Sequence, residues 1–130
     1  GPDAAEVQAA DQLKEAVGPQ AITTAGALSW AQLAGLLWRA RMFVGVDTAA
    51  MHLAAACQCP SVVLFGPSVA AAWRPWQVKH RVVGPAPSQR AKLPEEQWIQ
   101  SVETDAVVAA CRELQSECAE ARMELTGRNP

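Results

Sequence analysis

The residues best suited to chemistry in this 130-residue chain follow one apolar segment. Asp47 and Thr48 come directly after residues 43–46, and His52 comes four positions after Thr48. If the apolar segment is a strand and Thr48 begins a helix, Thr48 and His52 share one helix face. A carboxylate at a strand end accepts hydrogen bonds from hydroxyl groups. The pattern therefore favours a ligand that carries both hydroxyls and an anion.

The first turn of the expected helix offers backbone donors to that anion. The first N–H groups of a helix have no partner inside it, and the helix dipole favours negative charge there. Ala49 and Ala50 are small, so a phosphate or diphosphate can approach their N–H groups. A structural interpretation stays open, in which Asp47 and Thr48 are ordinary caps and His52 is a partly buried histidine with satisfied hydrogen bonds.

Charge is unevenly distributed along the chain. Residues 48–94 carry no acidic residue and five basic ones, whereas residues 1–47 and 95–130 have net charges of −2 and −5. A basic stretch attracts anions, although a charge fluctuation within an apolar segment would look the same. The basic residues are few and have no interleaved stacking aromatics, so we expect no nucleic-acid partner.

The cysteines and tryptophans favour structural interpretations. Cys57 and Cys59 flank one residue, and the other two cysteines are seven positions apart on an expected helix. Zinc sites usually take two close Cys-x-x-Cys pairs, so we expect no metal site. Trp73 and Trp76 are expected to pack, with stacking on a sugar as the alternative. The glutamates of the last helix are expected to form a solvated face.

Alternating apolar and amphipathic segments predict the elements that position these residues. Helices are expected over residues 3–17, 29–38, 48–58 and 104–125, and strands over residues 21–24, 42–46, 61–65 and 80–83, with residues 84–97 as a loop. Strands apolar on both faces that alternate with helices indicate an α/β fold, a Rossmann-like parallel sheet with helices on both faces. Ligands of such sheets bind outside the carboxyl ends of the strands, where Asp47 is expected.

Length and composition fit a single domain over residues 1–130. The chain is 50% hydrophobic and 18% charged, which supplies a core. No apolar run reaches the roughly 18 residues of a membrane-spanning helix. The first residues lack the basic and apolar regions of a secretory signal peptide.

Two sequence blocks follow each other closely. Residues 44–56 read Val-Gly-Val-Asp-Thr-Ala-Ala-Met-His-Leu-Ala-Ala-Ala, and residues 60–67 read Pro-Ser-Val-Val-Leu-Phe-Gly-Pro. They resemble the V-G-x-D-[ST]-[GA]-x-x-H-L-A-A-A and P-x-x-x-L-F-G-P blocks of glycosyltransferase family 9, the ADP-heptose:lipopolysaccharide heptosyltransferases. Residues 73–83 resemble the branch of third-type heptosyltransferases.

This resemblance implies a partial carboxyl-terminal domain of a GT-B glycosyltransferase, a fold of two Rossmann-like halves with the active site between them. The carboxyl half binds the donor, here ADP-heptose or a similar nucleotide sugar, without a cofactor or an obligatory metal. Asp47 is then expected to bind heptose hydroxyls. The backbone at Thr48 and Ala49 is expected to hold the diphosphate, with His52 nearby.

Two further residues enter through the resemblance alone. Glu6 falls where a family glutamate contacts the ribose, and Leu28 falls near the position that packs on adenine. Transfer in the family inverts the anomeric carbon by direct displacement. Ala49 stands where the family often has glycine, which keeps the N–H group but narrows the approach. Residues 84–97 lack the cysteines that the family often has in this loop.

Family members are roughly two to three times as long as a chain of one such domain. We therefore expect the acceptor-binding half, with its general base, to be absent, and assign no catalytic residue. The lipopolysaccharide core acceptor would bind through that half, in the cytoplasm or at the inner face of the inner membrane. The alternatives are a standalone, non-catalytic Rossmann-like module that binds a nucleotide, and an assembly module that binds none.

The resemblance also suggests that the sheet is incomplete. A doubly wound sheet has strand order 3-2-1-4-5-6. If residues 21–24 are the third strand, strand 42–46 has an open edge where the first strand belongs. Open apolar edges associate with other strands. We expect self-association through the 42–46 edge, insertion of residues 21–24 into the gap, or a neighbouring strand supplied from elsewhere.

Overall fold

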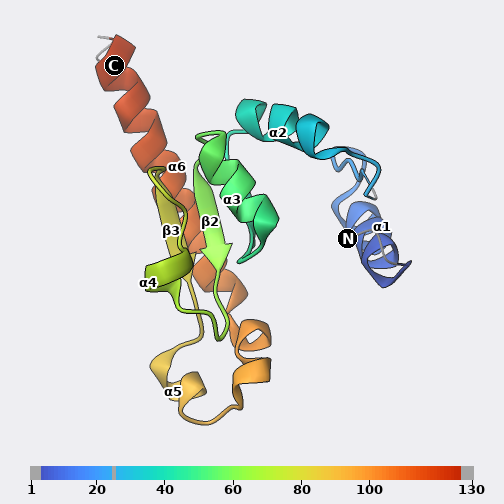
Figure 1. Cartoon of the computed structure of the whole chain (residues 1–130), viewed down its shortest axis with the longest axis vertical. Coiled ribbons are helices and arrows are strands. Elements are labelled where there is room, and N and C mark those ends of the chain that lie inside the picture. Colours follow the sequence, from blue (N-terminus) through green and yellow to red (C-terminus); the bar gives the residue numbers. More distant parts are fainter. Residues whose placement is uncertain (1–3, 25, 127–130) are drawn as a thin grey trace. The chain divides into compact units, whose positions relative to one another are not determined.

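The computed structural model describes residues 4–24 and 26–126, with side-chain environments given through residue 121 (Figure 1). The chain divides into two compact units, one within residues 1–33 and the other within residues 34–130. Each unit is described by itself. The helix α2 (Trp30–Arg39) spans the boundary between them.

The first unit contains one long helix and an extended segment. Helix α1 (Ala4–Val17) ends at Gly18, whose φ of 92° lies in the left-handed region, and the Gly18 N–H donates to the Lys14 carbonyl at 2.9 Å. Residues 21–24 are extended but form no strand, so the strand prediction is wrong there. A strand needs a neighbour to satisfy its backbone, and the three paired strands of the described chain all belong to the second unit. Ile22 is 89% exposed, which agrees with this lack of a partner.

Helix α2 begins as its sequence predicts. The Ser29 N–H donates to Gln32 Oε1 at 2.8 Å, and the Gln32 N–H donates back to Ser29 Oγ at 3.3 Å. These reciprocal bonds form a capping box, which satisfies backbone donors at the start of the helix.

The second unit is built on a parallel sheet of three strands in the order β1-β2-β3. The strands are β1 (Phe43–Val46), β2 (Ser61–Leu64) and β3 (His80–Val83). Helix α3 (Ala49–Ala56) connects the first two strands, and the short helix α4 (Ala70–Trp73) lies between the last two. The predicted α/β fold with a parallel sheet is confirmed, with strand bounds within one residue of those expected.

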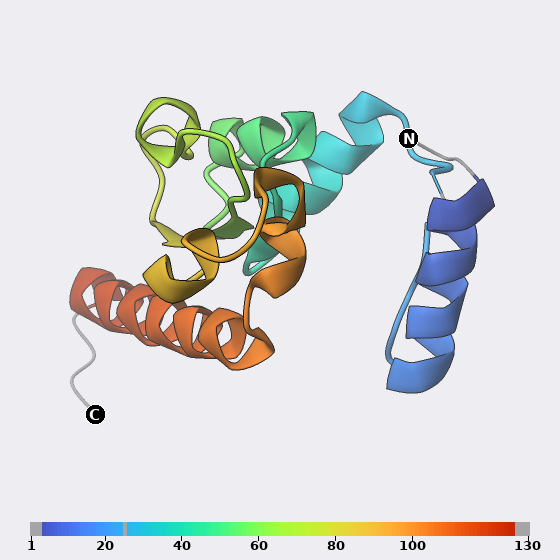
Figure 2. The same cartoon turned by 90° about the horizontal axis from the view of Figure 1, so that it is seen from below.

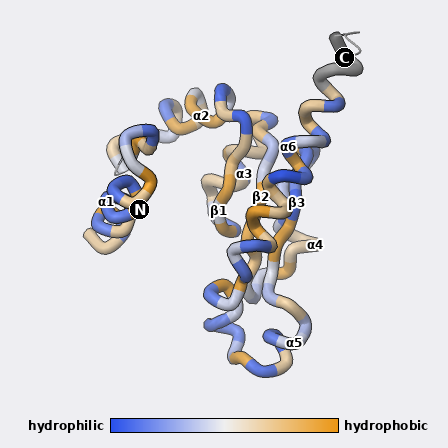
Figure 3. Tube along the Cα trace, turned by 180° about the vertical axis from the view of Figure 1, so that it is seen from behind, coloured by the Kyte–Doolittle hydropathy of each residue, from blue (hydrophilic) through white to orange (hydrophobic). Residues whose placement is uncertain are grey.

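Helices cover both faces of this sheet (Figures 1 and 2). On one face Val62 and Val83 pack with Ala110 and Leu114 of α6 (Thr104–Thr126). On the other face Val63 and Phe65 pack with Met51 of α3. Val62 and Val63 are adjacent in β2 and both fully buried, because successive strand residues point to opposite faces. Figure 3 shows the matching pattern, with hydrophobic residues gathered along the strands.

The segment between β3 and α6 is more ordered than the predicted loop. It contains the single-turn helix α5 (Pro87–Arg90) and two 3₁₀ turns, η1 (Glu95–Gln97) and η2 (Ile99–Ser101). The Arg90 guanidinium lies 5.1 Å from the centre of the Trp98 ring, a cation–π contact that fastens the segment.

Strand β1 lies at one edge of the sheet. Insertion of residues 21–24 beside it, one of the three expected outcomes, is wrong, because those residues form no strand. Val44 and Val46 are 50% and 43% exposed. Both share a face with Met42, which packs against the α6 cluster. The valines lie beyond the area that α6 covers, since this helix contacts β2 and β3.

Candidate functional site

Four of the predicted site residues lie at the junction of β1 and α3. Asp47 follows the last residue of β1 and is half-buried, and Thr48 has extended backbone angles, φ −145° and ψ 173°, that begin α3. Ala49 and Ala50 form the first turn of the helix. The geometry therefore brings a carboxylate and a helix N-terminus together at the carboxyl end of a strand, as the sequence predicts.

Thr48 does not cap the helix with its side chain. Its hydroxyl donates to the Val46 carbonyl at 3.5 Å and accepts no N–H from the first turn. A threonine at this position usually satisfies one of the free N–H groups. Thr48 is thus the N-cap residue of α3, as the structural interpretation expects, but its side chain makes no capping hydrogen bond.

The first two N–H groups of α3 are consequently open. The Met51 N–H donates to the Thr48 carbonyl at 3.0 Å, while the N–H groups of Ala49 and Ala50 have no acceptor among the described residues. Ala49 is exposed and Ala50 is half-buried. Two adjacent donors at the positive end of the helix dipole suit an anion.

Helix α3 is held firmly enough to present these donors. Met51, Ala54 and Ala55 are buried against β1 and β2. At the other end, the Cys59 N–H donates to the Ala54 carbonyl at 2.9 Å and the Gln58 N–H donates to the Ala55 carbonyl at 3.0 Å. This pair of bonds is a Schellman motif, which closes the helix.

His52 is exposed and meets an aromatic ring from another element. Its ring centre lies 6.3 Å from that of Trp73, with 70° between the ring planes, an edge-to-face contact. Trp73 ends α4 and is 56% exposed, and Trp76 is 76% exposed, while Pro75 between them is buried. The expectation that both tryptophans pack is wrong, because the buried proline anchors the loop and leaves the indoles outside. No sequence pattern predicts the contact between His52 and Trp73, which lie 21 positions apart.

Glu6 and Leu28 belong to the first unit, which is described by itself. Glu6 is exposed and lines a groove of about 390 Å³ within that unit, together with other residues of α1, residues 21–24 and Gly26. Leu28 is half-buried and lies outside the lining of this groove.

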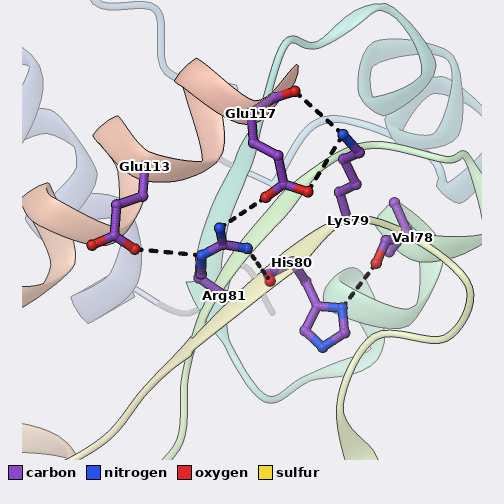
Figure 4. A network of polar contacts seen from close by, with 6 residues as sticks. All are labelled: Val78, Lys79, His80, Arg81, Glu113 and Glu117. Carbon is purple, nitrogen blue, oxygen red and sulfur yellow. Dashed lines mark hydrogen bonds and ion pairs between the residues drawn. The ribbon is translucent and has the colours of Figure 1, made fainter. Parts of the chain in front are cut away.

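Part of the basic stretch is neutralised within the fold. Arg81 and Lys79 pair with Glu117 of α6, at 2.8 and 3.4 Å, and Arg81 also lies 3.5 Å from Glu113 (Figure 4). Glu113 and Glu117 remain accessible to solvent, as expected for this face of the helix, and they also pair with cations of the same chain. Ion pairs between residues more than thirty positions apart leave no local sequence pattern.

The potential metal ligands of the described chain are dispersed. Among the residues that the structure describes, no group of three or more His, Cys, Asp or Glu side chains could hold a metal ion. All four cysteines are free thiols. Burial, with the neighbouring Cys57, raises the pKa of the Cys59 thiol above its ordinary value of 9.0, which disfavours the reactive thiolate. Within the described ranges, no helix is long and apolar enough to cross a membrane.

Comparison with known proteins identifies the family. The sequence profile of glycosyltransferase family 9 (heptosyltransferase) matches residues 1–102. The chain belongs to glycosyltransferase family 9. This family 9 chain is 34% identical over 77 residues to lipopolysaccharide heptosyltransferase 3 of Escherichia coli, covering 58% of the chain and 23% of the relative. It is 36% identical over 77 residues to the protein of that name from strain K12, covering 58% and 22%.

The family 9 chain thus spans less than a quarter of the length of the curated relatives it matches. No solved structure matches it.

Proposed function

We propose that the second unit binds the diphosphate and sugar of ADP-heptose, as the donor side of heptosyl transfer to the lipopolysaccharide core. The observation that carries this proposal is the pair of open N–H groups at Ala49 and Ala50, which Thr48 leaves uncapped. Asp47 and His52 supply hydrogen-bonding side chains beside them. Family membership supports the choice of a nucleotide sugar over other anions.

The open donors would serve the chemical step as well as binding. In an inverting transfer, the bond between the anomeric carbon and the diphosphate oxygen breaks, and its electron pair stays on the departing ADP. The acceptor oxygen bonds to the anomeric carbon from the opposite side and loses its proton to a base. Donors already aimed at the diphosphate stabilise the charge that develops there. We assign no residue of this chain as that base.

Side chains are proposed to make the other contacts to the nucleotide sugar. Asp47 accepts hydrogen bonds from heptose hydroxyls, since a carboxylate would repel the phosphates. His52 hydrogen-bonds a phosphate oxygen from the first turn of α3. Glu6 contacts the ribose and Leu28 the adenine, roles that come from family resemblance. The proposal places the whole protein at the inner face of the inner membrane, where its lipopolysaccharide acceptor is made.

The backbone donors can be tested without altering a side-chain contact. Ala49 is the first residue of α3, a position that accepts proline because its N–H makes no helical bond. Thr48 already has the extended backbone that a following proline requires. Ala49→Pro therefore deletes one donor and preserves the helix. Ala49→Gly, which keeps the N–H, is the matched control.

Calorimetric titration of the full chain with ADP and with ADP-heptose gives the readout. We expect Ala49→Pro to weaken both ligands by at least tenfold, because hydrogen bonds to charged groups contribute about 1.5–3 kcal/mol. Ala49→Gly should bind as the wild type does. Asp47→Asn should weaken ADP-heptose more than ADP. A wild-type chain that binds neither ligand would contradict the proposed function.

A further inference from the structure

The contact between His52 and Trp73 joins two exposed rings from different elements. His52 belongs to the first turn of α3, and Trp73 is the last residue of α4. In an edge-to-face pair, each ring keeps at least one face that its partner does not cover. Trp73 is 56% exposed, so a face of its indole is open to solvent.

Hydrogen bonds hold the backbone around Trp73, and its indole contacts the ring of His52. The backbone N–H of Trp73 donates to the Val69 carbonyl at 3.2 Å, and the Arg74 N–H donates to the Ala70 carbonyl at 2.9 Å. The next residue, Pro75, is buried. Because this backbone is already ordered, a ligand that covers the indole has little backbone freedom to remove.

An open indole face next to hydroxyl acceptors suits a sugar ring. A pyranose has an apolar face of C–H groups, which stacks on an aromatic ring, and a rim of hydroxyls, which need polar partners. Asp47 and His52 are polar groups near the junction where β1 ends and α3 begins. A purine would also stack on the indole, but it has no hydroxyl groups that could donate hydrogen bonds to the Asp47 carboxylate.

The order of groups in a nucleotide sugar favours the sugar further. The transferred sugar is bonded directly to the diphosphate, whereas the base is separated from it by the ribose. Ala49, Ala50 and His52 all belong to the first turn of α3, so a diphosphate at the two donors lies close to His52. The indole of Trp73 lies beside His52. We propose that Trp73 is the stacking platform for the donor's pyranose ring and thereby a specificity-determining residue. This inference rests on the proposed function.

Three variants of the full chain test the role of Trp73. Trp73→Leu removes the aromatic ring and Trp73→Phe retains a smaller one. Trp76→Leu is the control, since Trp76 is 76% exposed and has no ring contact within the part of the chain that the structure describes. Dissociation constants for ADP and ADP-heptose are measured by calorimetry, and circular dichroism verifies that each variant is folded.

The inference predicts a split between the two ligands. Trp73→Leu should weaken ADP-heptose about fivefold and leave ADP unchanged, and Trp73→Phe should restore part of the loss. Trp76→Leu should bind both ligands as the wild type does. An equal loss for ADP and ADP-heptose would assign the indole to the nucleotide and overturn the inference, as would no loss for either. In both cases the proposed function stands. If the wild type binds neither ligand, both the proposed function and this inference fail.

Discussion

Arg81 of β3 and Glu117 of α6 are joined by a hydrogen bond of 2.8 Å between Nη2 and Oε2 (Figure 4). The same carboxylate pairs with Lys79, whose Nζ also donates to the Glu117 backbone carbonyl at 3.3 Å. The apolar cluster around Leu114 supplies the burial that holds α6 on the sheet, while these directional contacts fix where along β3 the helix lies.

Because of these ion pairs, the stability of the fold depends on pH. Hydrogen bonds from Arg81 and Lys79 lower the pKa of Glu117 below its ordinary value of 4.5. The folded chain therefore favours the ionised carboxylate, so this stabilisation is complete above about pH 5 and is lost as pH falls through the lowered pKa. We expect the melting temperature of the wild type to decrease as the pH is lowered below 4.5. In Glu117→Gln the melting temperature should decrease less steeply over the same pH range. Glu120→Gln, an exposed change on the same helix, should retain the wild-type slope. Identical slopes for all three proteins would refute this role of Glu117.

A second prediction concerns the end of α3. Gln58 follows this helix with φ 57°, a left-handed conformation that costs a side-chain-bearing residue about 1–2 kcal/mol. Its Nε2 donates to the Ala55 carbonyl at 3.3 Å, which offsets part of that cost. Gln58→Gly should raise the free energy of unfolding by about 1 kcal/mol in urea titrations. Gln58→Ala loses the hydrogen bond and keeps the strain, so it should be less stable than the glycine variant. Equal stability of these two variants would show that no strain is stored there.

The three strands and α3 could be predicted because the burial of each element requires a pattern of apolar residues within its own segment. Val62 and Val63 must both be apolar, since helices cover each face of β2. Residues 21–24 have a similar local pattern, yet a strand forms only where a neighbour supplies hydrogen bonds, and that neighbour is not encoded locally.

Some features of the candidate site could likewise be predicted from the sequence, and others could not. Asp47 and Thr48 follow a strand directly, so the sequence alone places them at the sheet's carboxyl edge. The contact between His52 and Trp73 depends on how two helices pack, as does the neutralisation of Arg81. Such contacts join residues that are 21 or more positions apart, and side-chain type by itself does not reveal them.

Salt should weaken ADP binding less than expected from the five basic residues of the stretch 48–94. Lys79 and Arg81 are paired with α6, and Arg90 lies over Trp98. Arg74 follows Trp73 directly and is exposed, so it remains available to a diphosphate. We expect Arg74→Gln to weaken ADP binding about threefold at low ionic strength and to reduce the dependence of the dissociation constant on salt. Lys92→Gln, an exposed change in the segment after α5, is the control and should have little effect. A salt dependence that Arg74→Gln leaves unaltered would exclude Arg74 from the site.

The last prediction concerns the open edges of the sheet. Both outer strands, β1 and β3, have one unpaired edge within the described chain. Strand β3 and the residue before it carry Lys79, His80 and Arg81, and charges on an edge oppose pairing with another strand. Strand β1 reads Phe-Val-Gly-Val and exposes Val44 and Val46, so it has no such protection.

We therefore expect the chain to self-associate through β1. Light scattering coupled to gel filtration should show a mass that rises with protein concentration. Val44→Lys should shift the equilibrium toward the monomer by roughly tenfold, because a charged side chain on an edge strand opposes pairing with another strand. Val82→Lys makes the same change at another exposed valine, on β3, and should leave the association unchanged. A wild-type chain that stays monomeric at high concentration would refute this association, and an equal effect of both variants would show that it does not run through β1.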